Sequence, residues 1–113
     1  MFRLERLEED MQLLISKVVQ QELKHPDIEG MISITKVSIT PDQKYAKVYT
    51  SIYGVKDREK VLNALKKSAG FVRKQVALRM KMRNTPEITF VLDDSIEYGA
   101  HINKVINELT EEK

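Results

Sequence analysis

The chemistry that this sequence supports most directly is the binding of phosphate groups. Between positions 66 and 83 the chain carries seven basic residues and no acidic one, although its net charge is only +2. The seven are Lys66, Lys67, Arg73, Lys74, Arg79, Lys81 and Arg83. A Ser68-Ala69-Gly70 break interrupts this segment between two stretches of helical periodicity. Helix N–H groups and cationic side chains that point the same way attract phosphates, so we expect a nucleic-acid ligand.

Catalysis and metal binding have much weaker support. Cysteine is absent, and the two histidines, His25 and His101, lie far apart and outside any ligand-spaced motif. Asp93-Asp94 could serve a metal-dependent nuclease, but adjacent carboxylates on a turn point in different directions. Capping of a final helix is the simpler role for this pair. We therefore expect no enzyme activity, no metal and no cofactor.

The composition is that of an ordinary globular protein. The 113 residues are 42% hydrophobic and 32% charged, which predicts one folded domain over residues 1–113. No apolar run approaches the roughly 20 residues that a membrane-spanning helix needs. The N-terminus lacks the apolar stretch of a secretory signal, and there is no cysteine for disulfides. We therefore expect a cytoplasmic protein.

Apolar periodicity in the first half of the chain predicts a helix followed by a hairpin. Steps of three and four residues mark an amphipathic helix over residues 4–23, which His25-Pro26 ends. Residues 31–40 alternate with period two, and a change of phase near Thr35-Lys36 indicates a β-bulge. After a turn at residues 41–43 the alternation resumes. The residues of this second strand that face the core are predicted to be Ala46, Val48, Thr50 and Ile52.

The second half predicts two helices around the break. Asp57 is placed to cap the first, which ends near residues 68–70. The next helix is expected to end at Pro86, with Phe71 and Val72 on the side opposite to a basic face. That face consists of Arg73, Lys74, Ala77 and Lys81.

A strand at residues 88–92 and a helix at residues 102–109 follow, so the order is α-β-β-α-kink-α-β-α. Three strands covered by helices on one face make an α+β fold. This order, with a glycine break between the second and third helices, is similar to the type II KH fold.

Five short motifs extend this likeness. They are Glu22-Leu23-Lys24-His25-Pro26, Val37-Ser38-Ile39-Thr40-Pro41-Asp42, Ala46-Lys47-Val48-Tyr49, Ser68-Ala69-Gly70-Phe71-Val72-Arg73, and Pro86-Glu87-Ile88-Thr89-Phe90 with Asp93. Each motif alone is unspecific, but together they cover nearly the whole chain in the right order. In this combination the sequence resembles the ribosome-binding factor A family of bacterial maturation proteins.

The resemblance implies a non-catalytic protein that binds the ribosomal RNA of the small subunit and is associated with growth in the cold. In that family an Ala-x-Gly kink replaces the GxxG loop of KH domains, and here Ser68 stands at the alanine position. One glycine cannot form a backbone clamp, so we expect side chains around the kink to carry the binding. The predicted RNA-binding residues are Lys66, Lys67, Ser68, Ala69, Gly70, Arg73, Lys74, Lys81 and Arg83.

Gly70 and the tyrosines each have an alternative interpretation. Gly70 can be an ordinary helix C-cap, and a larger residue there is expected to harm both fold and binding. The outward face of the second strand carries Tyr45, Lys47, Tyr49 and Tyr53, an arrangement that RNA stacking platforms use. A half-wet strand face favours the same residue types, and this structural interpretation is preferred.

The leading hypothesis is a monomeric KH-like protein that binds the small ribosomal (30S) subunit through 16S rRNA. It would assist late 30S assembly and 16S rRNA processing, with no small-molecule substrate and no membrane. The alternative is an adaptor whose basic helix binds an acidic protein partner, and a nuclease acting through Asp93 and Asp94 is a distant third. Binding to RNA should weaken steeply with salt, whereas an adaptor should bind without RNA.

Overall fold

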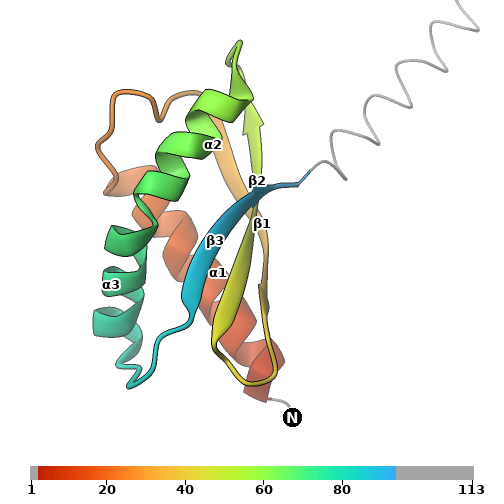
Figure 1. Cartoon of the computed structure of the whole chain (residues 1–113), viewed down its shortest axis with the longest axis vertical. Helices are drawn as coiled ribbons and strands as arrows, with labels where there is room; N and C mark the ends of the chain where they lie inside the picture. Colours follow the sequence, from red (N-terminus) through yellow and green to blue (C-terminus); the bar gives the residue numbers. More distant parts are fainter. Residues whose placement is uncertain (1–2, 94–113) are drawn as a thin grey trace, which may run out of the picture.

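The computed structural model describes residues 3–93, which form a three-stranded sheet with three helices on one face (Figure 1). The elements are α1 (Arg3–Gln21), β1 (Met31–Ile39), β2 (Tyr45–Tyr53), α2 (Arg58–Lys67), α3 (Ala69–Met80) and β3 (Glu87–Leu92). The predicted α+β class and the predicted order are confirmed as far as the third strand. The helix predicted at residues 102–109 lies outside the described residues.

The strand order in the sheet is β1-β2-β3. β1 and β2 are antiparallel, and β3 runs parallel to β2 after the chain has crossed through α2 and α3. The predicted bulge is present, since the β1–β2 register shifts between Ile34 and Lys36. One extra residue reverses the alternation of side chains. Both Ile34 and Val37 therefore point into the core although their positions differ in parity.

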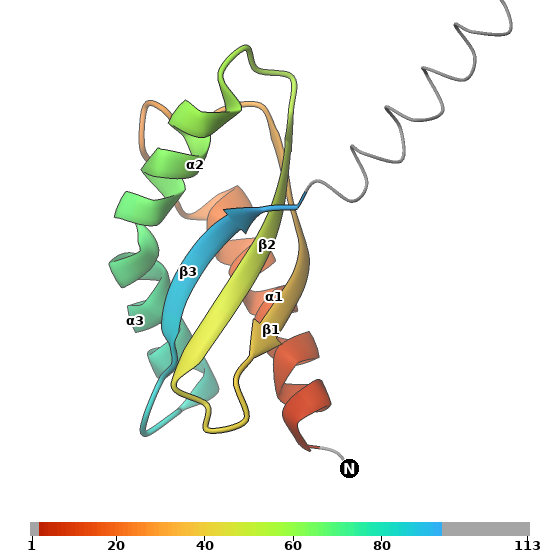
Figure 2. The ribbon, with the colours of Figure 1, turned by 45° about the vertical axis from the view of Figure 1, so that its right-hand side comes forward.

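The core lies between the sheet and the helices, a layering that Figure 2 shows from the side. β2 contributes the four predicted inward residues, Ala46, Val48, Thr50 and Ile52, all buried. α1 packs its apolar stripe against β1 and α3 and buries Met11, Ile15, Val18 and Val19 in the same core. Phe90 of β3 is fully buried in the middle, where a side chain of this size contributes about 2–3 kcal/mol. Among residues 3–93, no helix has the length and apolar character that crossing a membrane requires.

The break between α2 and α3 is centred on Ser68. α2 begins as predicted at the cap Asp57, whose carboxylate accepts a hydrogen bond from the Lys60 N–H at 3.1 Å. Ser68 is both the C-cap of α2 and the N-cap of α3, and its hydroxyl donates a hydrogen bond to the Ala64 carbonyl at 3.0 Å. Because this serine bonds back into α2, the junction needs no glycine with a left-handed backbone.

Gly70 does not lie at the end of α2, where the C-cap interpretation would place it. It lies in the first turn of α3, without a positive φ, so its interpretation as a helix C-cap is wrong. A Cβ added at Gly70 would meet no other atom within 4 Å. The expectation that a larger residue at Gly70 harms the fold has no steric basis in this structure.

Two further expectations for α3 are corrected. The helix ends at Met80 and not at Pro86, because Lys81 adopts the left-handed conformation with φ 54° and ψ 43°. Phe71 was expected on the covered side with Val72, yet 44% of its surface is exposed. The buried stripe of α3 consists of Val72 and Val76. Successive helical residues are about 100° apart around the axis, so Phe71 lies outside this narrow stripe.

Candidate nucleic-acid interface

A groove of about 780 Å³ opens between α3, the α3–β3 loop and the turn that joins β1 to β2. The turn and the loop lie at the same end of the molecule (Figure 1). They are bound together there, because the Glu87 N–H donates to the Lys44 carbonyl at 2.8 Å. The groove is lined by Asp42, Gln43, Lys44, Tyr45, Gly70, Arg73, Lys74, Ala77, Arg83, Asn84, Thr85 and Glu87.

The charges of the groove are divided unevenly between its two sides. The side formed by α3 and the α3–β3 loop has three cations, Arg73, Lys74 and Arg83, and no acid. The side formed by the hairpin turn and the start of β3 is mixed, with Lys44 beside two acids. The acids are Asp42 and Glu87. A strand of phosphates is attracted to the first side and repelled by part of the second.

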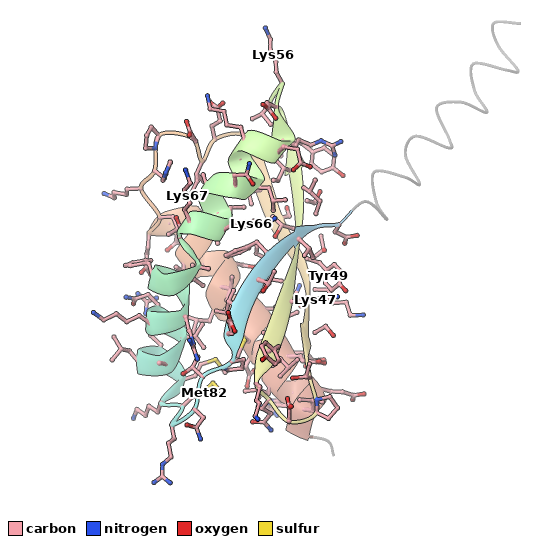
Figure 3. All side chains as sticks on the ribbon, in the orientation of Figure 1. Lys47, Tyr49, Lys56, Lys66, Lys67 and Met82 are labelled. Atoms are coloured by element: carbon pink, nitrogen blue, oxygen red, sulfur yellow. The ribbon has the colours of Figure 1, made fainter. Side chains whose placement is uncertain are left out.

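Four of the nine predicted RNA-binding residues meet in this groove: Gly70, Arg73, Lys74 and Arg83. The other five do not line it. Lys66 and Lys67 are exposed on the last turn of α2, at a distance from the loop that Met82 marks in Figure 3. Ser68 and Ala69 are half-buried at the junction, and Lys81 is exposed at the end of α3. The basic segment is therefore not one continuous surface.

Arg73 is held by the protein itself. Its guanidinium donates two hydrogen bonds to the carbonyl oxygen of Thr85, from Nε at 3.2 Å and from Nη2 at 2.8 Å. A neutral carbonyl leaves the positive charge of Arg73 uncancelled. The two bonds fasten the loop that carries Arg83 and Asn84 to α3, so Arg73 shapes the wall of the groove besides charging it.

Arg79 does not line the groove, and its guanidinium is engaged elsewhere. It forms an ion pair with Glu22, just beyond α1, in which the guanidinium donates to the carboxylate. This hydrogen bond holds the pKa of Glu22 below its ordinary value. The pair joins the end of α1 to α3 on the side away from the groove lining. Arg79 was counted in the basic segment, but it was not among the predicted RNA-binding residues.

Sequence reasoning missed the hairpin side of the groove. Asp42 accepts hydrogen bonds from the Thr40 hydroxyl at 2.7 Å and from the Lys44 N–H at 3.0 Å. These bonds, the first above all, lower the pKa of Asp42, so its carboxylate is charged at neutral pH. A Thr-Pro-Asp turn followed by lysine was the available signal. Nothing local in it indicates that Lys44 faces α3.

The tyrosines of β2 do not form one platform. Tyr45 lines the groove, whereas Tyr53 is at the opposite end of the strand, paired with Met31. Between them, Tyr49 lies with Lys47 on the sheet face away from the helices (Figure 3). The Lys36 ammonium lies 5.9 Å from the centre of the Tyr49 ring, a cation–π contact. The outward residues thus have three separate surroundings.

The residues considered for metal binding have structural contacts. His25 Nδ1 accepts a hydrogen bond from the Asp27 N–H at 3.1 Å and orders the turn after α1. The Asp93 carboxylate accepts one from the Thr35 hydroxyl, across the bulge of β1. Within residues 3–93, no three acidic or histidine side chains are grouped so as to hold a metal ion. His101 and Asp94 lie outside the described residues.

Comparison with known proteins gives consistent results over nearly the whole chain. The family model described as Ribosome-binding factor A matches residues 3–106. The chain is 47% identical to the ribosome-binding factor A of Clostridium tetani over 111 residues, which cover 97% of this chain and 92% of that protein. It is 48% identical to the one from Acetivibrio thermocellus over 109 residues, 96% of this chain and 89% of that protein.

A crystal structure and a set of coordinates fitted into a cryo-EM map share the fold. The crystal structure of ribosome-binding factor A from Thermus thermophilus superposes with a TM-score of 0.71 at 21% identity, covering 80% of this chain and 97% of that chain. Coordinates of a homology model of the Thermus thermophilus protein, fitted into the cryo-EM map of a complex between the 30S subunit and ribosome-binding factor A, superpose with a TM-score of 0.66 at 20% identity. They cover 79% of this chain and 93% of that chain.

Proposed function

Because the chain belongs to the ribosome-binding factor A family, we propose that it binds the small ribosomal subunit through 16S rRNA. The one observation on this molecule that carries the proposal is the groove, whose α3 and loop side presents Arg73, Lys74 and Arg83 without an acid. The fitted Thermus thermophilus protein, which is bound to a 30S subunit, supports the same partner.

The proposed action is binding without catalysis. A protein that binds one conformation of a maturing subunit more tightly than another shifts the population toward the first. Through this preference the protein would assist late 30S assembly and 16S rRNA processing, as a cytoplasmic monomer and with particular importance in the cold. The positive side of the groove supplies the attraction for phosphates, and the shape of the domain supplies the preference.

Sedimentation with purified subunits tests the proposal. The wild type is expected to sediment with the 30S subunit and not with the 50S subunit. The variant Lys74→Glu/Arg83→Glu, shown to be folded by circular dichroism, should lose most of this association, because two cations of the groove become anions. The matched control is Lys24→Glu/Lys56→Glu, which reverses two exposed charges outside the groove lining; Lys56 lies at the far end of the molecule (Figure 3).

Failure of the wild type to sediment with the 30S subunit, in low and physiological salt, would refute the proposed function. Equal association of the groove variant and the control variant would move the binding surface away from the groove. Either result can be interpreted only if both variants are folded. Circular dichroism establishes this before the sedimentation experiment.

One observation favours the adaptor as a second candidate. Phe71 and Leu78 are 44% and 62% exposed, lie two turns apart on α3, and have Lys74 between them. Exposed apolar side chains beside a lysine suit a protein surface with an apolar patch and an acidic rim. An adaptor of this kind keeps its partner after nuclease digestion of the RNA and loses it in Phe71→Ser/Leu78→Ser.

A further inference from the structure

We infer that the groove binds an unpaired nucleotide, with its base against the ring of Tyr45 and its phosphates along the side that carries Lys74 and Arg83. The inference rests on the proposed function and deepens it, because it replaces rRNA in general by a single-stranded segment. It combines three observations on the groove: the division of charge, the exposed tyrosine ring and the rigid backbone that carries this tyrosine.

The charges decide which way a nucleotide can lie. Among residues 3–93, no hydrogen bond or ion pair engages the ammonium of Lys74 or the guanidinium of Arg83, so both remain available to phosphates. On the opposite side the two acids, Asp42 and Glu87, outnumber the one cation, Lys44, so this side is net negative and repels a phosphate. The backbone of the ligand is therefore held on the α3 side, and its base is the part that faces the hairpin.

Tyr45 is the aromatic residue that lines this groove among the described residues, and 54% of its surface is exposed. A tyrosine ring with a free face stacks on a nucleobase with little dependence on sequence. Tyr49 differs, because the Lys36 ammonium already lies near its ring. Of the three tyrosines for which the sequence left stacking open as an alternative, Tyr45 is thus the one that the groove favours.

The backbone of Tyr45 is fixed before any ligand arrives. The Tyr45 carbonyl accepts from the Thr40 N–H at 2.9 Å, and the Tyr45 N–H donates to the Thr40 hydroxyl at 3.1 Å. Across the sheet Tyr45 pairs with Glu87 at the start of β3. An aromatic side chain on a rigid backbone loses little freedom when it binds.

The size of the groove also suits a short single-stranded segment. Its volume of about 780 Å³ falls within the roughly 300–1,000 Å³ of sites for small organic ligands. In a duplex the faces of the bases are stacked on one another and cannot reach a tyrosine ring. Unpaired bases of loops, bulges and strand ends expose theirs.

Fluorescence gives a direct test, because the chain has no tryptophan. The variant Tyr45→Trp places a single reporter in the groove, and Tyr53→Trp places one at the other end of β2, outside the groove lining. The probe is an oligomer of about ten adenosines, within the site sizes of single-strand binders. A duplex of the same length is the control. We expect saturable quenching of Tyr45→Trp by the single strand, and little change with the duplex or in Tyr53→Trp.

Variants without tryptophan test the inference even if tryptophan disturbs the turn. Tyr45→Leu retains an apolar side chain without a π face, and it should bind the oligomer about 5- to 150-fold more weakly, the range for loss of one base stack. Tyr45→Phe should bind as the wild type does. Wild-type affinity of Tyr45→Leu, or equal quenching of both tryptophan variants, would overturn the inference.

The outcomes separate this inference from the proposed function. If the wild type sediments with the 30S subunit while the oligomer fails to quench Tyr45→Trp, the inference about the groove is refuted and the proposed function is supported. Quenching by the oligomer without association to the 30S subunit sinks the function and leaves a single-strand site. Quenching of Tyr45→Trp by the 30S subunit alone would mean that the groove contacts a structured part of the subunit and not a free single strand, which also overturns the inference.

Discussion

The two arginines of α3 differ in role from the lysines Lys74 and Lys81, which lie within this helix and at its C-cap. Arg73 is fastened to the Thr85 carbonyl and Arg79 to the Glu22 carboxylate, so α3 uses both to hold neighbouring elements in place. Lys74 and Lys81 are exposed and, within residues 3–93, have no such contact. The guanidinium has a planar set of donors that fits a carbonyl or a carboxylate, whereas the lysine ammonium remains well hydrated.

This difference shows why the number of basic residues is a poor measure of a binding surface. All seven cations contribute to the local charge, but only three of them line the groove. Lys44, from a distant part of the sequence, adds a fourth. Three sets of variants test whether the division between fastened and available cations is correct, and Gly70→Ala tests the junction before α3.

The largest effect is expected when available cations of the groove are removed. Lys74→Gln/Arg83→Gln should bind single-stranded RNA about tenfold or more weakly, because two charge-assisted contacts to phosphate are lost. The slope of log affinity against log salt should become shallower by about 1.4. The matched variant is Lys66→Gln/Lys67→Gln, two exposed lysines outside the groove lining. Titrations over a range of salt check both, and equal slopes for the two variants would contradict the division.

A smaller effect is expected at Arg73. Arg73→Lys keeps the charge but loses the fork that holds Thr85, so the loop with Arg83 and Asn84 is less well fixed. Binding should fall severalfold with an unchanged salt slope, and the free energy of unfolding should fall by about 1 kcal/mol. Titration and urea denaturation measure the two quantities. Arg73→Gln removes the charge as well, and a salt slope shallower by about 0.7 in that variant would identify Arg73 as a phosphate contact.

Gly70→Ala should leave the fold intact. A Cβ at this position meets nothing within 4 Å, and alanine is the better residue inside a helix, so the free energy of unfolding should stay equal or rise by up to about 1 kcal/mol. Urea denaturation decides between this outcome and the loss of stability that the sequence suggested for a kink glycine.

The smallest effect concerns Glu22 and depends on pH. The pKa of Glu22 is lowered in the folded protein, so its pairing with Arg79 stabilises the fold at neutral pH, and this contribution is lost as the pH falls through the lowered pKa. Glu22→Gln should therefore melt slightly below the wild type at neutral pH and together with it once the pH lies below the lowered pKa. RNA binding of Glu22→Gln should equal that of the wild type, since the pair lies outside the groove.

The parts of the fold that the sequence predicted correctly are those that local signals encode. Alternation along residues 45–53 identified the inward face of β2, the phase change near Lys36 identified the bulge, and Asp57 identified the start of α2. The errors lie where the same local residues are compatible with several backbone conformations. A serine capped the junction in place of Gly70, and a left-handed Lys81 ended α3 before Pro86 could.

The sequence by itself determined the order of the described elements, the core face of β2 and the concentration of positive charge between residues 66 and 83. Only the tertiary structure decided which of those charges line the groove. The physical reason is that periodicity and capping act over a few residues, whereas Arg79 meets Glu22 from 57 positions away. Lys44 and Tyr45 likewise reach the groove only because β3 pairs with β2 and brings the hairpin turn beside α3.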